Sequence, residues 1–172
     1  MYLKISLRNQ FYALKELVII SIVYFGLMGF LYIKAEFDLF KILFISTFFL
    51  YLIIFLLPVI ILHINYLNNS KYKSVAINEN KLTIDENVFI DSDIDRIIIF
   101  ATNQHFNNSV GVSALPYNDH YYYIEICLKT GDKINLTSLL DYKIDMIVKE
   151  NFKSVNIVEK NSTLVLLLIN KN

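Results

Sequence analysis

The stretches LVIISIVYFGLMGFLYI (residues 17–33) and ILFISTFFLYLIIFLLPVIIL (residues 42–62) decide the fold of this 172-residue chain. Each comes close to the roughly 20 apolar residues that an α-helix needs to cross a hydrocarbon core. The connector, residues 34–41, is too short to form a domain, so the sequence predicts a transmembrane hairpin with helices over about residues 12–33 and 42–64. We therefore divide the chain into an N-terminal segment with the hairpin, residues 1–67, and a soluble domain, residues 68–172.

Positive charges beside the two runs predict the orientation of the hairpin. Three Lys or Arg residues precede the first run and two, Lys71 and Lys73, follow the second, whereas the connector holds Lys34 and Lys41. Cytoplasmic flanks are enriched in Lys and Arg, so both termini and the soluble domain are expected in the cytoplasm. Lys71 and Lys73 are the expected contacts with the surface of the lipid bilayer. Neither run contains an ionisable residue, which disfavours a channel or transporter and favours an anchor.

The charge balance and the cysteine count exclude other classes. Residues 1–69 carry five Lys/Arg and three Asp/Glu, and residues 70–172 carry eleven and thirteen. A slightly acidic soluble part lacks the clustered positive charge that nucleic-acid binding needs, so no nucleic-acid partner is expected. Cys127 is the only cysteine, which excludes an intrachain disulfide.

Short apolar segments separated by turn residues predict an antiparallel sheet after residue 73. The clearest hairpin joins residues 121–129 to residues 133–136 through Thr130-Gly131-Asp132, and side chains from Tyr122 to Leu128 alternate between two faces. The expected strands lie at residues 74–77, 81–84, 88–90, 94–100, 121–129 and 133–136.

The remaining segments give one helix, a second hairpin and one ambiguous end. Ser138 can cap a helix over about residues 139–151, whose apolar side chains recur at helical spacing. Two apolar runs, residues 154–158 and 164–169, predict a terminal strand hairpin. Residues 3–8 alternate in polarity, which fits either a strand that joins the soluble sheet or the start of an interfacial helix; the alternation slightly favours the strand.

Two segments carry a family resemblance. They are VAINENKLTIDENVFIDSDIDRIII (residues 75–99) and YYYIEICLKTGDKINLTSLLDYKIDMIVKENF (residues 121–152), in which a strand meander, a K-T-G-D-K turn and an amphipathic helix follow a membrane hairpin. This order resembles the bacterial pleckstrin-homology-like (PH-like) membrane proteins, including the YcxB-like group. The resemblance implies an α+β fold with a bent antiparallel sheet closed by a helix, in a multi-pass protein of the bacterial inner membrane. The chain differs from that pattern by its strand-like sequence after the helix and its long polar loop at residues 102–120.

Candidate sites for chemistry are weak. Asp91, Asp93 and Asp95 resemble part of a calcium loop, but the glycine and glutamate that such a loop needs are replaced, so a solvated turn is the better interpretation. His105 and His120, with Asp119, have no partner at zinc-like spacing. We expect no catalytic residue, no metal and no cofactor.

The expected activity is therefore protein binding. The loop at residues 102–120 is long enough to be functional, and its apolar side chains could contact a partner; sheet edges offer a second route, by strand addition. The candidate partner-binding residues are Phe106, Val112, Leu115 and Tyr117. Our first hypothesis is a non-enzymatic protein that binds or scaffolds an unidentified protein, or a second copy of itself, at the membrane. The alternative, which the family resemblance permits, is an immunity or envelope-stress factor that protects the membrane against a bacteriocin-like peptide.

Overall fold

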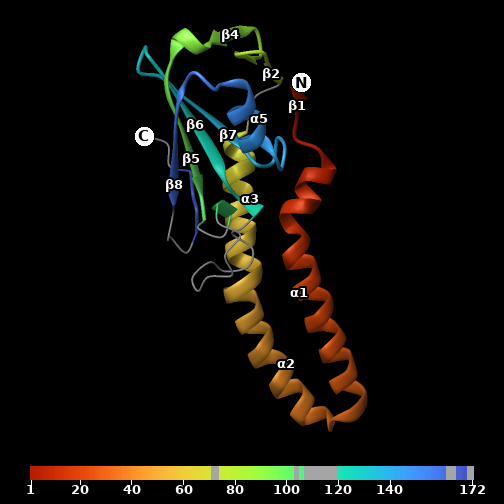
Figure 1. The fold of residues 1–172 in the computed structure, drawn as a ribbon. Helices are drawn as coiled ribbons and strands as arrows, with labels where there is room; N and C mark the ends of the chain where they lie inside the picture. Colours follow the sequence, from red (N-terminus) through yellow and green to blue (C-terminus); the bar gives the residue numbers. More distant parts are fainter. Residues whose placement is uncertain (71–73, 103–104, 107–119, 162–165, 170–172) are drawn as a thin grey trace.

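The computed structural model describes residues 1–70, 74–102, 105–106, 120–161 and 166–169. Two long helices lie side by side and form the stem in Figure 1. Helix α1 spans Leu7–Lys34, and the return helix consists of α2 (Phe37–Tyr51), the π-helical segment η1 (Leu52–Leu56) and α3 (Leu57–Asn69). Both are long and apolar enough to cross a membrane. They extend beyond the expected residues 12–33 and 42–64. At the end near the sheets, the additional turns of α1 and α3 pack on the domain through Asn9 and Tyr66.

Hydroxyl groups and one aromatic stack join the two helices. Ser21 Oγ lies 2.6 Å from Tyr51 OH, and Tyr24 OH lies 3.3 Å from Thr47 Oγ1. The rings of Tyr24 and Tyr51 stack with their centroids 4.8 Å apart. The hydroxyl residues that interrupt the apolar runs therefore form the contact between the helices, as interhelical polar contacts do in membrane proteins.

Proline accounts for the π-helical segment. Pro58 has no backbone N–H, so it cannot donate the α-helical hydrogen bond to the carbonyl four residues earlier. The ladder shifts by one residue just before it, and the Leu57 N–H donates to the Leu52 carbonyl. The helix thus continues through Pro58 with a local change of pitch, which is a recognised cause of bends.

The first sheet contains four antiparallel strands in the order β1-β2-β3-β4. Tight turns connect β2 to β3 and β3 to β4, and Glu79, Asn80 and Asp85 take positive φ in them. The N-terminal strand β1 pairs with β2, and α1 begins four residues later. Both interpretations of the N-terminus are therefore partly correct: a short strand comes first and the helix follows. The strands are β1 (Tyr2–Leu3), β2 (Val75–Asn78), β3 (Lys81–Ile84) and β4 (Asn87–Ile90).

The second sheet has the order β7-β6-β5-β8, with β8 parallel to β5. A 3-10 turn, η2 (Asp91–Asp93), leads from the first sheet into β5, and helix α5 (Ile144–Asn151) connects β7 to β8. The strands are β5 (Ile94–Ala101), β6 (Tyr123–Leu128), β7 (Lys133–Thr137) and β8 (Asn156–Asn161).

Two predictions for the C-terminal part were wrong. The helix begins at Ile144 and not near residue 139, because the Ser138 hydroxyl is used elsewhere: it donates to the His120 carbonyl at 2.9 Å. The terminal strand hairpin is also wrong. β8 pairs in parallel with β5, and residues 166–169 form no strand but lie against the helices.

Two apolar clusters lie on opposite faces of β6. The main core fills the space between the sheets and α5, and it takes Tyr122, Ile124 and Ile126 from β6 and the residue before it. The second cluster takes Tyr121 and Tyr123, and it also contains residues of α1, α3 and the segment 166–169. The predicted alternation of side chains from Tyr121 to Leu128 is confirmed, and its second face is where the domain meets the hairpin.

Candidate functional site

The predicted partner-binding loop is only partly visible. Phe106 is half-buried and packs against the main core, so its ring helps to fix the start of the loop. Val112, Leu115 and Tyr117 lie outside the described residues, as do Lys71 and Lys73. The loop and the two lysines therefore stay predictions.

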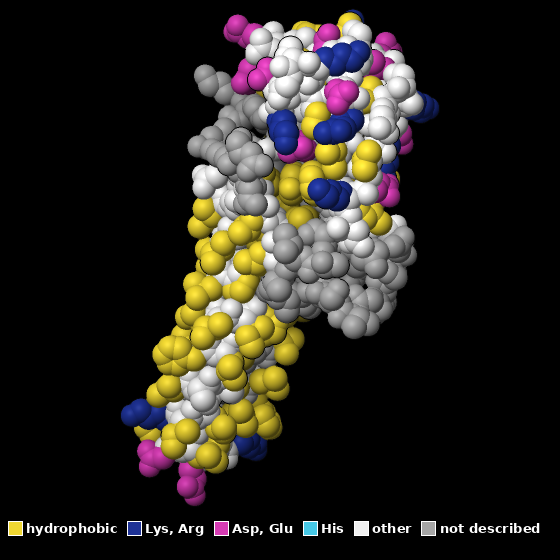
Figure 2. All heavy atoms as spheres, turned by 90° about the vertical axis from the view of Figure 1, so that its left-hand side faces the viewer, with side chains coloured by type: hydrophobic (Ala, Val, Ile, Leu, Met, Phe, Trp, Pro, Cys, Tyr) yellow, Lys and Arg dark blue, Asp and Glu magenta, His cyan; other side chains and the backbone are white. Residues whose placement is uncertain are grey.

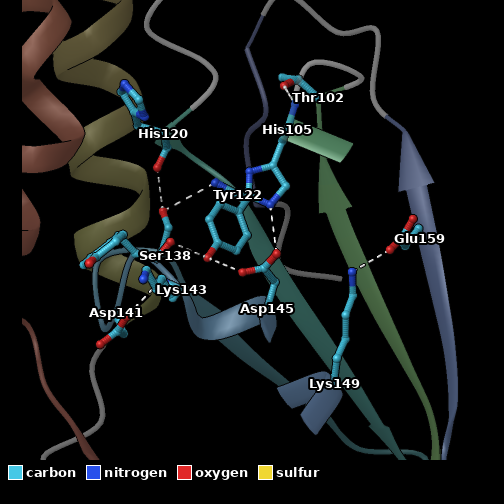
Figure 3. A network of polar contacts seen from close by, with 11 residues as sticks. Thr102, His105, His120, Tyr122, Ser138, Asp141, Lys143, Asp145, Lys149 and Glu159 are labelled. Carbon is cyan, nitrogen blue, oxygen red and sulfur yellow. Dashed lines mark hydrogen bonds and ion pairs between the residues drawn. The ribbon is translucent and has the colours of Figure 1, made fainter. Parts of the chain in front are cut away.

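A buried polar cluster lies where this loop leaves the sheet (Figure 3). His105 Nε2 is 3.1 Å from Asp145 Oδ2, and Tyr122 OH is 3.0 Å from Asp145 Oδ1. The Tyr122 hydroxyl is also 2.9 Å from the Tyr142 carbonyl, and the His105 ring lies on the Tyr122 ring with centroids 4.3 Å apart. Asp145 belongs to the first turn of α5, where the helix dipole favours a carboxylate.

The electrostatics of this cluster keep Asp145 ionised and Tyr122 neutral. Burial alone would raise the pKa of Asp145, but the hydrogen bond and charge of His105 and the hydrogen bond from Tyr122 outweigh it and lower the pKa. Burial, followed by the nearby Asp145 charge, raises the pKa of Tyr122 well above its usual range. Both carboxylate oxygens are occupied by donors, so the cluster connects the loop to α5 and offers no free nucleophile or base.

The second histidine has separate partners. His120 Nε2 is 3.5 Å from Glu16 Oε1 of α1, and its ring lies 5.0 Å from the ring of Tyr12. His105 and His120 therefore do not form the pair considered from the sequence, and Asp119 lies outside the described residues. Within the described ranges, no three His, Cys, Asp or Glu side chains are grouped as a metal would require.

Helix α1 is connected to the domain by a buried asparagine. The Asn9 side-chain amide donates to the Leu140 carbonyl at 2.7 Å and lies 3.4 Å from the Leu139 carbonyl. Asn9 is 8% exposed, so both carbonyls would otherwise lie in a dry interface. This contact explains why the helix begins well before the apolar run.

Helix α3 is connected to the domain in the same way. His63 Nδ1 is 2.9 Å from Tyr121 OH, and the Asn65 side chain forms two hydrogen bonds with the backbone of Ile169, at 3.2 and 2.9 Å. The contacts show that α1 and α3 both hold the domain, so the hairpin and the sheets form one unit.

The acidic run between the two sheets is used within the chain. Asp93 Oδ2 accepts a hydrogen bond from the Ile90 N–H at 2.9 Å, and Asp91 accepts one from Ser154. Asp95 is exposed and lies 4.0 Å from the guanidinium of Arg96. These contacts shape the 3-10 turn that leads into β5.

The surface divides into an apolar stem and a charged head. Figure 2 shows hydrophobic side chains along the stem, with charges gathered at the tip of the hairpin and over the domain. Large exposed apolar residues such as Ile22, Phe30 and Phe49 cover both helices. Soluble monomers rarely expose an apolar surface this extensive, whereas lipid-facing helices do.

Two sheets with a helix across their shared core define a PH-like α+β fold, built here onto an apolar helical hairpin. A family model described as a PH domain matches residues 3–149, and the chain therefore belongs to this family. No curated protein matches the chain. PH-like domains are generally non-catalytic and bind proteins or lipids, so the family indicates a binding or scaffolding role.

Proposed function

We propose that the chain is a multi-pass protein of the bacterial inner membrane, related to the YcxB-like group, whose PH-like domain binds proteins on the cytoplasmic side. The observation that carries this proposal is the contact of the domain with both α1 and α3, through Asn9, His63 and Asn65. A domain held at two points has a fixed position relative to the bilayer. Its binding surfaces are then presented in one orientation, which suits a scaffold.

The free edge of the first sheet supports binding by strand addition. Strand β4 ends this sheet, and its Val88 and Ile90 side chains are 57% and 42% exposed. Because Ile84 pairs with Asn87 across a two-residue turn, the N–H and C=O of Val88 point to the free side. Natural edge strands are commonly protected by lysine or proline, and β4 has neither.

The charges around β4 indicate the chemistry of the partner. Asp85 and Glu86 precede the strand, and Asp91, Asp93 and Asp95 follow it. A second β4 strand would bring like charges together, which is unfavourable. We therefore expect an extended segment with apolar side chains at alternate positions and Lys or Arg at its ends. The loop at residues 102–120 is the second proposed binding surface.

Site-specific photo-crosslinking in membranes tests the edge. A benzophenone side chain at position 88 should give one discrete crosslinked adduct. A competing peptide that forms a strand and carries Lys or Arg at its ends should lower the yield of this adduct. The matched control is position 158 on β8, the edge of the other sheet, where Val158 is 42% exposed but adjoins Glu159 and Lys160. The same adducts from both positions, or none from position 88, would contradict binding at β4. An adduct lost on deletion of residues 104–118 would shift the binding surface to the loop.

Topology and the alternative function are tested separately. Cys127 is only 8% exposed, so it is a poor probe; a cysteine at the exposed Asp132, in a Cys127→Ala background, replaces it. We expect an impermeant thiol reagent to label this cysteine only after the cells are permeabilised. The protective role predicts instead that deletion of the gene makes cells more sensitive to a membrane-active peptide.

A further inference from the structure

A pocket lies beside the first turns of α1, before the apolar run begins. Its volume is about 300 Å³, and it is lined by Arg8, Phe11, Tyr12, Lys15 and Tyr142. The four residues of α1 fall at the i, i+3, i+4 and i+7 positions, so they share one face of the helix. Tyr142 comes from the turn before α5, and its ring lies 4.8 Å from that of Tyr12.

Three cations surround these rings. Lys15 Nζ lies 4.7 Å from the centre of the Tyr12 ring, and Lys143 Nζ lies 5.5 Å from the centre of the Tyr142 ring. Arg8 is exposed, and in the part of the chain that the structure describes no side chain or carbonyl is recorded as bonded to its guanidinium. A guanidinium with free donors beside an ammonium is suited to a phosphate group.

The neighbouring acidic groups do not neutralise this site. Glu16 lies 4.0 Å from Lys15 Nζ, but the same carboxylate oxygen is 3.5 Å from His120 Nε2. Asp141 accepts a hydrogen bond from the Lys143 backbone N–H at 2.8 Å within its own turn. Three cations against two carboxylates still leave an excess of about one positive charge, which favours an anion over a zwitterionic or cationic ligand.

The level of the pocket distinguishes a lipid from a free ion. At about 1.5 Å per residue, Lys15 and Tyr12 lie roughly 3 and 8 Å before Leu17, where the apolar run begins. The headgroup layer of a bilayer is about 5–8 Å thick on each side. Phe11 is 63% exposed on the same helix face, and it provides an apolar surface that a free phosphate cannot use.

We propose that this pocket binds the phosphate headgroup of an anionic phospholipid from the membrane that the hairpin spans, with Arg8 and Lys15 as the phosphate ligands. The inference rests on the proposed membrane anchoring. The site lies on the face of α1 and the turn before α5. It is distinct from the β2–β3 turn, which holds Asn78, Glu79, Asn80 and only one cation, Lys81.

A tryptophan reporter tests the proposal on the full chain. The sequence has no tryptophan, so Tyr142→Trp places the only indole in the wall of the pocket. The purified protein in neutral detergent is titrated with phosphatidylglycerol, with phosphatidylcholine and with inorganic phosphate. We expect a saturable emission change with phosphatidylglycerol and about tenfold weaker binding of phosphatidylcholine.

The variant Arg8→Gln/Lys15→Gln should lose this preference, and Lys34→Gln/Lys41→Gln, which removes two cations at the other end of the hairpin, should keep it. If the double variant does not fold, Arg8→Gln alone is used, because the exposed Arg8 has no recorded partner among the described residues. Equal responses to both lipids, or equal responses of the two double variants, would overturn the site. A saturable emission change with inorganic phosphate, and none with phosphatidylglycerol, would overturn the assignment of a lipid as the ligand. Failure of the protein to float with liposomes would instead contradict the proposed membrane anchoring.

Discussion

Replacing Asp145 by alanine should destabilise the domain by about 3 kcal/mol, because it removes the shared acceptor of the buried polar cluster. Charge-assisted hydrogen bonds contribute about 1.5–3 kcal/mol each. Tyr122 keeps the Tyr142 carbonyl as a second acceptor, so its share is the smaller, whereas Asp145 is the one partner of His105 Nε2 among the described residues. Urea unfolding of the purified protein in detergent, followed by circular dichroism, measures the difference.

The pH dependence of this deficit has a definite sign. The folded-state pKa of Asp145 lies below its ordinary value of 3.8, so the folded state favours the carboxylate. Its contribution is complete above that value and is lost as the pH falls through the folded-state pKa. The deficit of Asp145→Ala should therefore shrink as the pH falls below about pH 4.

A double-mutant cycle and a charge-matched control separate the bond from a general effect of charge. His105→Ala and Asp145→Ala should couple by at least about 1 kcal/mol. Glu150→Ala removes an exposed carboxylate from the same helix and should change the unfolding free energy by less than about 0.5 kcal/mol. Two results would refute the assignment of the cluster as the connection between loop and helix. One is that the effects of His105→Ala and Asp145→Ala on the unfolding free energy simply add; the other is that Glu150→Ala lowers the unfolding free energy as much as Asp145→Ala does.

Three further predictions follow from other contacts. Asn9→Ala should lower the unfolding free energy by about 1–3 kcal/mol, since it leaves two buried carbonyls without a donor; no loss in the same unfolding assay would contradict the connection of α1 to the domain. Burial raises the pKa of Tyr121, and it raises the pKa of Tyr123 to about 12. The folded state therefore favours the neutral phenols, and their contribution to the unfolding free energy is lost as the pH rises above about 10. The chain has twelve tyrosines, so the tyrosinate absorbance of a Tyr121→Phe/Tyr123→Phe variant is subtracted from that of the unmodified protein. The difference should rise together with the loss of circular dichroism, and ionisation before unfolding would count against the burial of these two residues. Lys149→Ala should cost less than about 1 kcal/mol and should lose its effect at high salt, because the 2.6 Å ion pair with Glu159 is largely exposed; a larger, salt-independent loss in urea unfolding would show that Lys149 acts through packing.

The local pattern of the sequence predicted most strands because each is specified by its own residues and turns. The alternation along β6 and the two hairpin turns beside Asn80 and Gly131 depend on contacts a few residues apart. The helix start was missed because Ser138, a good cap by pattern, is bonded to the His120 carbonyl across the β6–β7 pair. The parallel β8 was missed because a short polar strand gives no signal of the strand that it joins.

The candidate site was less predictable, since its parts come from distant segments. Asp145 was not noted as a candidate; in the sequence it is one acidic residue of an amphipathic helix, and its partner His105 lies 40 residues away. The link between Asn9 and Leu140 joins residues 131 apart. One signal was available for α3: His63 and Asn65 interrupt the apolar pattern near the end of that helix, whereas Asn9 lies among other polar residues and gave none. Polar residues at such positions need a partner when they are buried.

The double attachment of the domain fixes its position relative to the two apolar helices. A PH-like domain on a flexible linker would sample many orientations and would lose conformational entropy each time it bound a partner at the membrane. Here Asn9 of α1 bonds Leu140, and His63 of α3 bonds Tyr121; these two segments flank the open end of the β6–β7 hairpin. The hairpin therefore has a structural role in the domain, in addition to the proposed membrane anchoring. It completes the second apolar cluster of the domain, so removing the hairpin would expose Tyr121, Tyr123 and Leu139 to water and leave the domain without part of its core.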